Sequence, residues 1–173
     1  NGSGPDYLAM KEAMDSALLI VTELTEGGHV PELKVLNKAA KPVLLLDGEE
    51  LSGAKQNRVL NTTILLKEHA ETVIPVSCTE QGRWSYRTQH FEESGYIMTT
   101  KLRTAKNESV AQSLRSTRRY DSDQGAVWNG IRAQSIAAAV HSPTGAMRDI
   151  HEARERDLDD YLEHFPLVPE QKG

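Results

Sequence analysis

The chain has 173 residues, a length that suits one ordinary domain or one domain with a helical extension. Its formal net charge is −5 and its hydrophobic content is 38%, so the composition indicates a folded protein, and nucleic acid is not the expected partner. Its apolar runs are far shorter than the ~20 residues that cross a bilayer, so no membrane partner is expected.

A single cysteine, Cys78, cannot form an internal disulfide, so nothing in the fold requires an oxidising compartment. We therefore expect a cytoplasmic location. Residues 1–5 are typical of a loop, and residues 165–169 are typical of an extended tail after a helix. We expect a further element to follow this C-terminal tail.

A short helix opens the expected order of elements. Residues 6–16 are good helix formers, and Asp6 can cap the first N–H groups. The following stretches are short, rich in β-branched residues and separated by turn residues, which predicts antiparallel strands. The expected strands cover residues 17–25, 33–36, 43–46, 59–66 and 72–78.

Two positions define the expected geometry of this β region. Asp47-Gly48 tolerates the positive φ angles of a tight hairpin turn, so the chain should reverse there. Pro75 has no N–H to donate, which predicts an edge strand or a bulge for residues 72–78. Several strands at this spacing indicate a β-sandwich or a small barrel.

The pattern becomes helical in the C-terminal part of the chain. We expect helices over 104–115, after the capping residues Asp121 or Ser122, and after Ser142-Pro143. The predicted fold class is therefore α+β, with an antiparallel β-sandwich-like N-terminal layer followed by three C-terminal helices. Residues 1–100 would form the β layer with its short helix, and residues 101–173 would pack on it, either as a separate segment or within one single domain.

The densest polar stretch runs from Asp47 to Arg58. Its glycines would let backbone N–H groups approach a phosphate, while Lys55 and Arg58 supply a charge and a bidentate fork. It is not a Walker motif, because Gly53 is followed by Ala-Lys-Gln and not by Gly-Lys-Ser/Thr. An ordinary charged turn is the competing interpretation.

A second cluster runs from Cys78 to Trp84. A thiolate at Cys78 with Arg83 would suit phosphate-ester chemistry, but the spacing is one residue shorter than such loops use. A small core cysteine is the favoured interpretation. Arg83 and Trp84 are better candidates for a cation and a stacking platform beneath a base or ribose.

A third polar group, Asp123 and Gln124, precedes the helix that carries Trp128. Helix capping already explains Asp121 and Ser122, so Asp123 and Gln124 are the candidates for a site. No histidine spacing suits a metal, a magnesium site at the carboxylates near Asp47 has little support, and the sequence identifies no cofactor.

The strings Leu45-Leu46-Asp47-Gly48-Glu49-Glu50-Leu51, Gly53-Ala54-Lys55-Gln56-Asn57-Arg58 and Pro75-Val76-Ser77-Cys78, with Glu80 and Gly82-Arg83-Trp84, resemble a known family. It is the ADP-ribosylglycohydrolase- and rhodanese-phosphatase-associated protein family of bacteria and archaea. The stretches 122–128 and 142–146 match as well, so the resemblance spans residues 5–169. It implies a truncated member and an association with ADP-ribose and phosphate chemistry, without a catalytic mechanism.

Three functions are consistent with these patterns. The preferred one is a binding or accessory module for a nucleotide or ADP-ribose-like ligand, with the 47–58 and 80–84 segments converging on one pocket. An alternative is a hydrolase of a phosphate or glycosidic bond, with Glu49, Glu50 or Glu80 as general base. A third is a structural or protein-interaction domain, and the oligomeric state is left open. The predicted ligand-binding residues are Asp47, Lys55, Gln56, Asn57, Arg58, Arg83, Trp84, Asp123 and Gln124.

Overall fold

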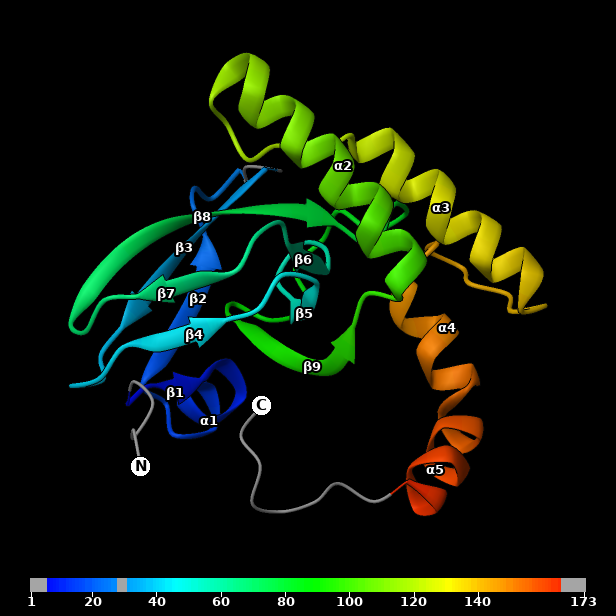
Figure 1. The fold of residues 1–173 in the computed structure, drawn as a ribbon, viewed down its shortest axis with the longest axis horizontal. Coiled ribbons are helices and arrows are strands. Elements are labelled where there is room, and N and C mark those ends of the chain that lie inside the picture. Colours follow the sequence, from blue (N-terminus) through cyan, green and yellow to red (C-terminus); the bar gives the residue numbers. More distant parts are fainter. Residues whose placement is uncertain (1–5, 28–30, 166–173) are drawn as a thin grey trace.

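The protein combines two β-sheets with a set of C-terminal helices, so the predicted α+β class is confirmed (Figure 1). The computed structural model describes residues 6–27 and 31–165. The smaller sheet has the strand order β1-β4-β7, with β1 (Leu8–Ala9), β4 (Val43–Leu45) and β7 (Ile64–Leu66). The larger sheet has the order β2-β3-β8-β6-β5-β9, with β2 (Leu19–Glu23), β3 (Glu32–Asn37), β8 (Ala70–Cys78), β6 (Arg58–Leu60), β5 (Glu49–Gly53) and β9 (Phe91–Ile97).

The helices are α1 (Met10–Asp15), α2 (Thr100–Thr117), α3 (Gln124–Ala137), α4 (Met147–Ala153) and α5 (Glu155–His164). The last predicted helix is two helices, because the backbone at Arg154 departs from helical geometry with φ −110° and ψ 9°. Within residues 6–27 and 31–165, no helix has the length and apolarity needed to cross a bilayer.

An apolar core lies between the two sheets. Alternate residues of β2 and β3 point into it, such as Leu19 and Val21 on β2 and Leu33 and Val35 on β3. Val43 of the smaller sheet faces the same core. The end strands β2 and β9 of the larger sheet contact each other, so this sheet is strongly curled around its apolar side.

Strand β6 separates this inner core from a second one beneath the helices. Leu60 points into the inner core, whereas its neighbour Val59 points outward. Arg58 lies two positions before Leu60, so its side chain is on the inner side. The outer core consists of Val59, Met98, Leu102, Val127, Ile131, Met147 and Ile150.

The chain does not form a hairpin at Asp47-Gly48, and that prediction is wrong. Gly48 has the expected positive φ of 86°, but β4 pairs with β7 whereas β5 pairs with β6 and β9. The turn therefore carries the chain from the smaller sheet to the larger one. The expected strand 59–66 crosses between sheets in the same way, since β6 and β7 belong to different sheets.

Strand β8 is not an edge strand, which corrects the expectation drawn from Pro75. It pairs with β3 through Pro75 and with β6 from Val76 onward. The residue without an N–H thus stands where the strand changes partner, and its carbonyl accepts a hydrogen bond of 3.1 Å from the Asn61 N–H. A position where a strand changes its pairing partner can hold a proline, just as an edge strand can.

Asp47 fixes α2 to the sheets. Its carboxylate accepts hydrogen bonds from Arg103 Nε at 2.6 Å, Lys106 Nζ at 2.5 Å and Asn107 Nδ2 at 2.7 Å. Burial raises the pKa of Asp47, but these donors outweigh it and hold the pKa below its usual range. Lys106 is fully buried and also donates to the carbonyl oxygens of Leu60 and Asn61 at 2.9 and 3.2 Å.

Replacing Asp47 with Asn should destabilise the protein by about 3–5 kcal/mol, because it leaves the buried Lys106 ammonium without its anionic partner. The double variant D47N/K106M should recover part of this loss, since it removes both charges. The measurement is the free energy of unfolding by urea. Asp15→Asn breaks an exposed pair with Lys11 and serves as the control, with a much smaller effect expected. A D47N variant as stable as D15N would contradict this role of Asp47.

Candidate functional site

Arg83 joins the two polar segments that the sequence singled out. Its Nε and Nη2 contact Glu80 Oε2 at 2.8 and 2.6 Å. Its Nη1 donates to the carbonyl oxygens of Ala54 and Ser85, and its Nη2 also donates to the Gly53 carbonyl and to Asn57 Oδ1. Both terminal nitrogens and Nε are therefore engaged within the protein, and the 53–58 and 80–85 segments are direct neighbours.

Glu80 is the acidic partner in this junction. Besides Arg83, it accepts the Asn57 backbone N–H at 3.3 Å and the Thr144 hydroxyl at 3.0 Å. Burial raises the pKa of Glu80, but the hydrogen bonds and charge of Arg83 outweigh burial and hold the pKa below its usual range. Glu80 is thus a stable carboxylate that orders the chain around it.

The loop after Arg83 packs tightly on the end of β5. Gly53 has a φ of 117°, and a Cβ at this position would collide with the Thr88 hydroxyl and the His90 carbonyl. The Ala54 N–H donates to Thr88 Oγ1 at 3.1 Å, and the Ala54 carbonyl accepts the Arg87 N–H at 2.9 Å. These contacts hold the 84–90 loop over the end of the curled sheet.

Arg58 lies fully buried beneath this loop. Its Nη1 donates to Gln56 Oε1 at 3.0 Å and contacts Cys78 Sγ at 2.9 Å. Gln56 in turn donates to the Glu80 carbonyl at 2.9 Å. A continuous polar network therefore connects Arg58 to the Arg83 junction.

Glu23 is the anionic partner of Arg58, and it is not among the site residues predicted from the sequence. Its Oε1 lies 3.7 Å from Arg58 Nη2 and accepts the Lys55 N–H at 3.4 Å. Among the described residues, Glu23 Oε2 and Arg58 Nε have no hydrogen-bond partner. The signal was present in the alternation of β2, since Glu23 follows the inward-facing Leu19 and Val21 at the same spacing.

Two aromatic side chains cover this network. The Lys55 ammonium lies 5.4 Å from the centre of the Trp84 ring and 5.1 Å from that of Tyr86, within the range of cation–π attraction. The Arg58 guanidinium carbon is 5.9 Å from the Trp84 ring. Trp84 is 49% exposed and Tyr86 is 52% exposed, so both rings can also contact a ligand.

A groove of ≈ 690 Å³ lies beside Tyr86. Thr22, Glu23 and Glu26 line one side of it, and Tyr86, Gln89 and His90 line the other. Glu23 belongs both to the groove and to the buried ion pair, so the groove gives access to the network beneath it. Its lining combines an aromatic face with carboxylate, amide and hydroxyl groups, a set that suits a polar ligand with a planar part.

Cys78 has the properties of a structural residue. Burial raises the pKa of its thiol to about 11, although the nearby Arg58 charge partly opposes this effect. The thiol is therefore protonated at neutral pH and can donate to Gln56 Oε1, 3.1 Å away. A protonated, buried thiol is a poor nucleophile, in agreement with the interpretation of a core cysteine.

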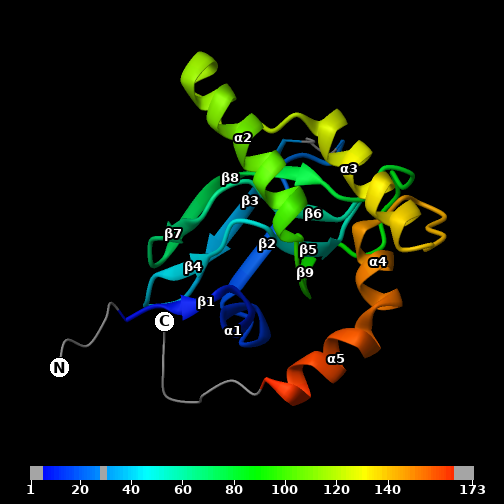
Figure 2. The ribbon, with the colours of Figure 1, turned by 45° about the vertical axis from the view of Figure 1, so that its right-hand side comes forward.

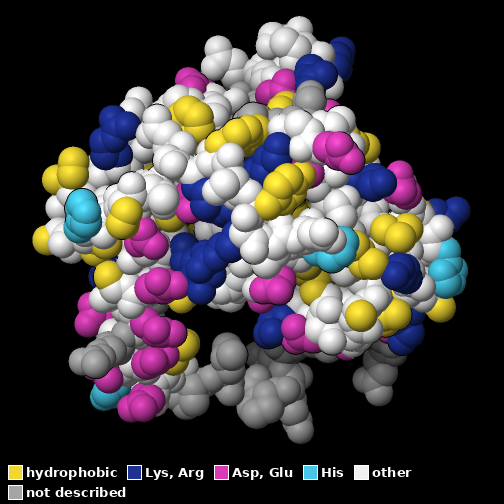
Figure 3. Space-filling view, turned by 180° about the vertical axis from the view of Figure 1, so that it is seen from behind, with side chains coloured by type: hydrophobic (Ala, Val, Ile, Leu, Met, Phe, Trp, Pro, Cys, Tyr) yellow, Lys and Arg dark blue, Asp and Glu magenta, His cyan; other side chains and the backbone are white. Residues whose placement is uncertain are grey.

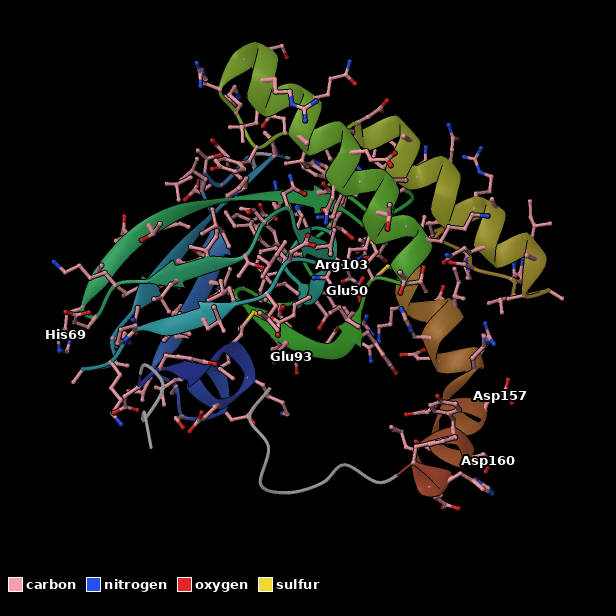
Figure 4. The ribbon with its side chains drawn as sticks, viewed as in Figure 1. Glu50, His69, Glu93, Arg103, Asp157 and Asp160 are labelled. Carbon is pink, nitrogen blue, oxygen red and sulfur yellow. The ribbon has the colours of Figure 1, made fainter. Side chains whose placement is uncertain are left out.

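Glu50 lies on the opposite face of β5 from the neighbouring Leu51, which points into the inner core. It is fully buried, accepts the Thr79 hydroxyl at 2.6 Å through Oε1, and leaves Oε2 without a partner among the described residues. Burial raises its pKa to about 7, and the Thr79 hydroxyl opposes this effect only in part. Figure 4 places Glu50 near the middle of the molecule and His69 at its far end.

The other predicted site residues have contacts away from the groove. Asp47 binds α2, and Glu49 accepts the Leu46 N–H at 2.7 Å. Asp123 caps α3 by accepting the Ala126 N–H at 2.9 Å, and Gln124 binds the backbone N–H and carbonyl of Cys78 at 2.7 and 2.9 Å. Across the described part of the chain, no group of three or more His, Cys, Asp and Glu residues is arranged to hold a metal ion.

Replacing Glu50 with Gln should change how stability depends on pH. The folded pKa of about 7 lies above the ordinary glutamate pKa of 4.5, so the wild-type protein is fully stabilised by the bound proton below about pH 4.5 and loses this stability as the pH rises through 7. We expect the free energy of unfolding of E50Q to exceed that of the wild type by about 3 kcal/mol above pH ~8, and by much less near pH ~4.5. The measurement is urea unfolding at both pH values.

Glu92→Gln removes an exposed carboxylate of β9 and controls for the loss of one negative charge. An E50Q advantage that is equal at both pH values would contradict the raised pKa of Glu50.

The family model that matches this chain covers all of it. That model, described as the ARG and Rhodanese-Phosphatase-superfamily-associated Protein domain, spans residues 1–173. This match confirms the rhodanese-phosphatase-associated family that the motifs indicated. No curated protein and no solved structure matches the chain. The chain belongs to the ARG and Rhodanese-Phosphatase-superfamily-associated Protein family.

Proposed function

We propose that this chain is a binding module for a nucleotide or ADP-ribose-like ligand, and that the ligand occupies the groove between β2 and the 84–90 loop. The observation that carries the proposal is Glu23, a buried carboxylate with an unpaired oxygen at a groove lined by the exposed Tyr86 ring. Buried polar groups are normally satisfied, so an unpaired oxygen beside a groove supports a role in holding a hydroxyl or N–H of a ligand.

The surrounding residues suit the parts of such a ligand. Tyr86 and Trp84 offer ring faces on which a base can stack. Glu26 and Gln89 offer groups that bind hydroxyls, and Lys55 supplies a positive charge for a phosphate.

Arg83 takes a positioning role in this proposal. Its nitrogens are all engaged by Glu80, Asn57 and backbone carbonyls, so it orders the 84–90 loop and leaves phosphate binding to Lys55. Arg58 contributes its charge from beneath, through the ion pair with Glu23.

A hydrolase of phosphate or glycosidic bonds is the second candidate, and Glu50 favours it. Its pKa of about 7 and its unpaired oxygen suit a general acid or base at neutral pH, but Glu50 is fully buried and does not line the groove. Glu80 suits this role less well, because Arg83 holds its pKa low. Turnover that E50Q lowers by about 100-fold or more would support the hydrolase, and unchanged turnover in E50Q would exclude Glu50 as its base.

The binding module is tested by calorimetry and thermal unfolding with AMP, ADP, ADP-ribose and ribose 5-phosphate. A ligand at a hundred times its Kd should add about 2.7 kcal/mol to the free energy of unfolding. Tyr86→Ala should weaken binding by about 5- to 150-fold through the loss of one stacking face. Lys55→Gln should weaken the binding of all four ligands, because each of them carries a phosphate.

Tyr120→Ala is the matched control, since Tyr120 is 43% exposed and lies outside the groove lining. Absence of binding for all four ligands, or equal affinity in Y86A and the wild type, would reject the groove as a nucleotide site.

A further inference from the structure

A second hollow lies between α2 and α3, on the helical side of the protein. It has a volume of ≈ 210 Å³, and small side chains such as Ala105, Ala126 and Ala133 leave it open. Leu102 and Val127 contribute apolar walls. An apolar cavity of about 150 Å³ is large enough to hold a benzene ring, so this hollow can accept one aromatic side chain.

Helix α5 and Phe165, the residue that follows it, expose apolar side chains to solvent. Tyr161 is 62% exposed, Leu162 is 56% exposed and Phe165 is 62% exposed, and the two rings lie 4.7 Å apart. The spacing of three and four residues puts these side chains on one side of the helix. Its main contact with the rest of the protein is α4, and in both ribbon views it lies below α4, away from α2 and α3 (Figures 1 and 2).

The two surfaces have opposite charges. Helix α5 carries five Asp and Glu residues, including Asp157 and Asp160 on its outer side, and acidic side chains gather where it projects (Figures 3 and 4). Helix α2 carries four Lys and Arg residues and one Glu, but Arg103 and the buried Lys106 are paired with Asp47, so the remaining positive charge of α2 comes from Lys101 and Arg115. Lys101 of α2 lines the hollow, is exposed and has no ion-pair partner among the described residues.

We propose that α5 of one copy of this chain docks in the α2–α3 hollow of a second copy. Phe165 or Tyr161 would enter the hollow, and the acidic residues beside it would face Lys101. The contact joins two different surfaces, so it is head-to-tail and leaves one unused surface of each kind on a dimer. One short helix buries less area than a standard interface, so the association is weak and requires a high protein concentration.

Sedimentation velocity from about 5 to 500 µM tests the proposal at low and high salt. We expect association that grows with concentration and weakens as salt screens the charges. Leu162→Ser should lower the association constant by about tenfold. Leu65→Ser is the control and should leave the association constant unchanged, although Leu65 on β7 has the same 56% exposure. Lys101→Glu should also weaken association, with Lys67→Glu as the control for charge.

A mixing experiment distinguishes this contact from symmetric pairing of two α5 helices. A variant with a damaged α5 (L162S/F165S) and a variant with a filled hollow (A133L) should each remain monomeric alone. Mixed together, they should form a dimer of one copy of each that does not grow further, because each retains the surface that the other lacks. A monomer at all concentrations, association of A133L alone, or failure of the mixture to pair would each overturn the proposal.

Discussion

The buried guanidinium of Arg58 is the constraint around which one end of the protein is organised. Removing an arginine from water costs several kcal/mol unless its charge is paired and its N–H groups are satisfied. Glu23 supplies the opposite charge, and Gln56 and Cys78 accept from the terminal nitrogen Nη1, while Nε and Nη2 have no hydrogen-bond partner among the described residues. Each of these partners must hold its place for Arg58 to remain inside, which explains why the surrounding loops are so strongly cross-linked.

The same constraint fixes the register of β6. Arg58, Val59 and Leu60 alternate between the inner and outer sides of the larger sheet. A slip of one residue would move Arg58 into the apolar core beneath the helices and Val59 into the ionic network. A short strand of three residues therefore has only one acceptable alignment, which also determines where the 53–58 segment meets Arg83.

The groove and the ion pairs have different roles in this arrangement. Arg83 and Glu80 use their hydrogen-bonding capacity on the protein itself, so they determine where the 84–90 loop lies. Lys55, Trp84 and Tyr86 remain partly accessible above them. A rigid ionic base beneath an accessible aromatic surface would preorganise the proposed site, because little ordering would be left for the moment of binding.

Local patterns were enough to predict the α+β class and most of the helices and strands, since these depend on spacing and capping within a few residues. The path of the chain between sheets was not predictable in this way. Asp47-Gly48 has the residues of a hairpin turn, and only the partners of β4 and β5 reveal a crossing. Strands β5 and β9 were missed because they are rich in Glu, Ser and Gly, and their pairing with each other overrides this weak propensity.

The candidate site was predictable in part for the same reason. Arg58 and Arg83 stand out as charges in the chain, but their state depends on partners some twenty to thirty positions away. Glu23 was detectable from the alternation of β2, whereas the exposure of Tyr86 depends on how the 84–90 loop packs on Gly53. Which polar side chains lie at the groove depends on their burial and not on their residue type.

The only thiol of the chain sits beside Arg58, fully enclosed and with a high pKa. Reagents that modify thiolates cannot reach it while the curled sheet is closed, so its rate of labelling measures how often this end of the molecule opens. The labelling rate of Cys78 therefore reports local opening at the end of the molecule where the ligand is proposed to bind.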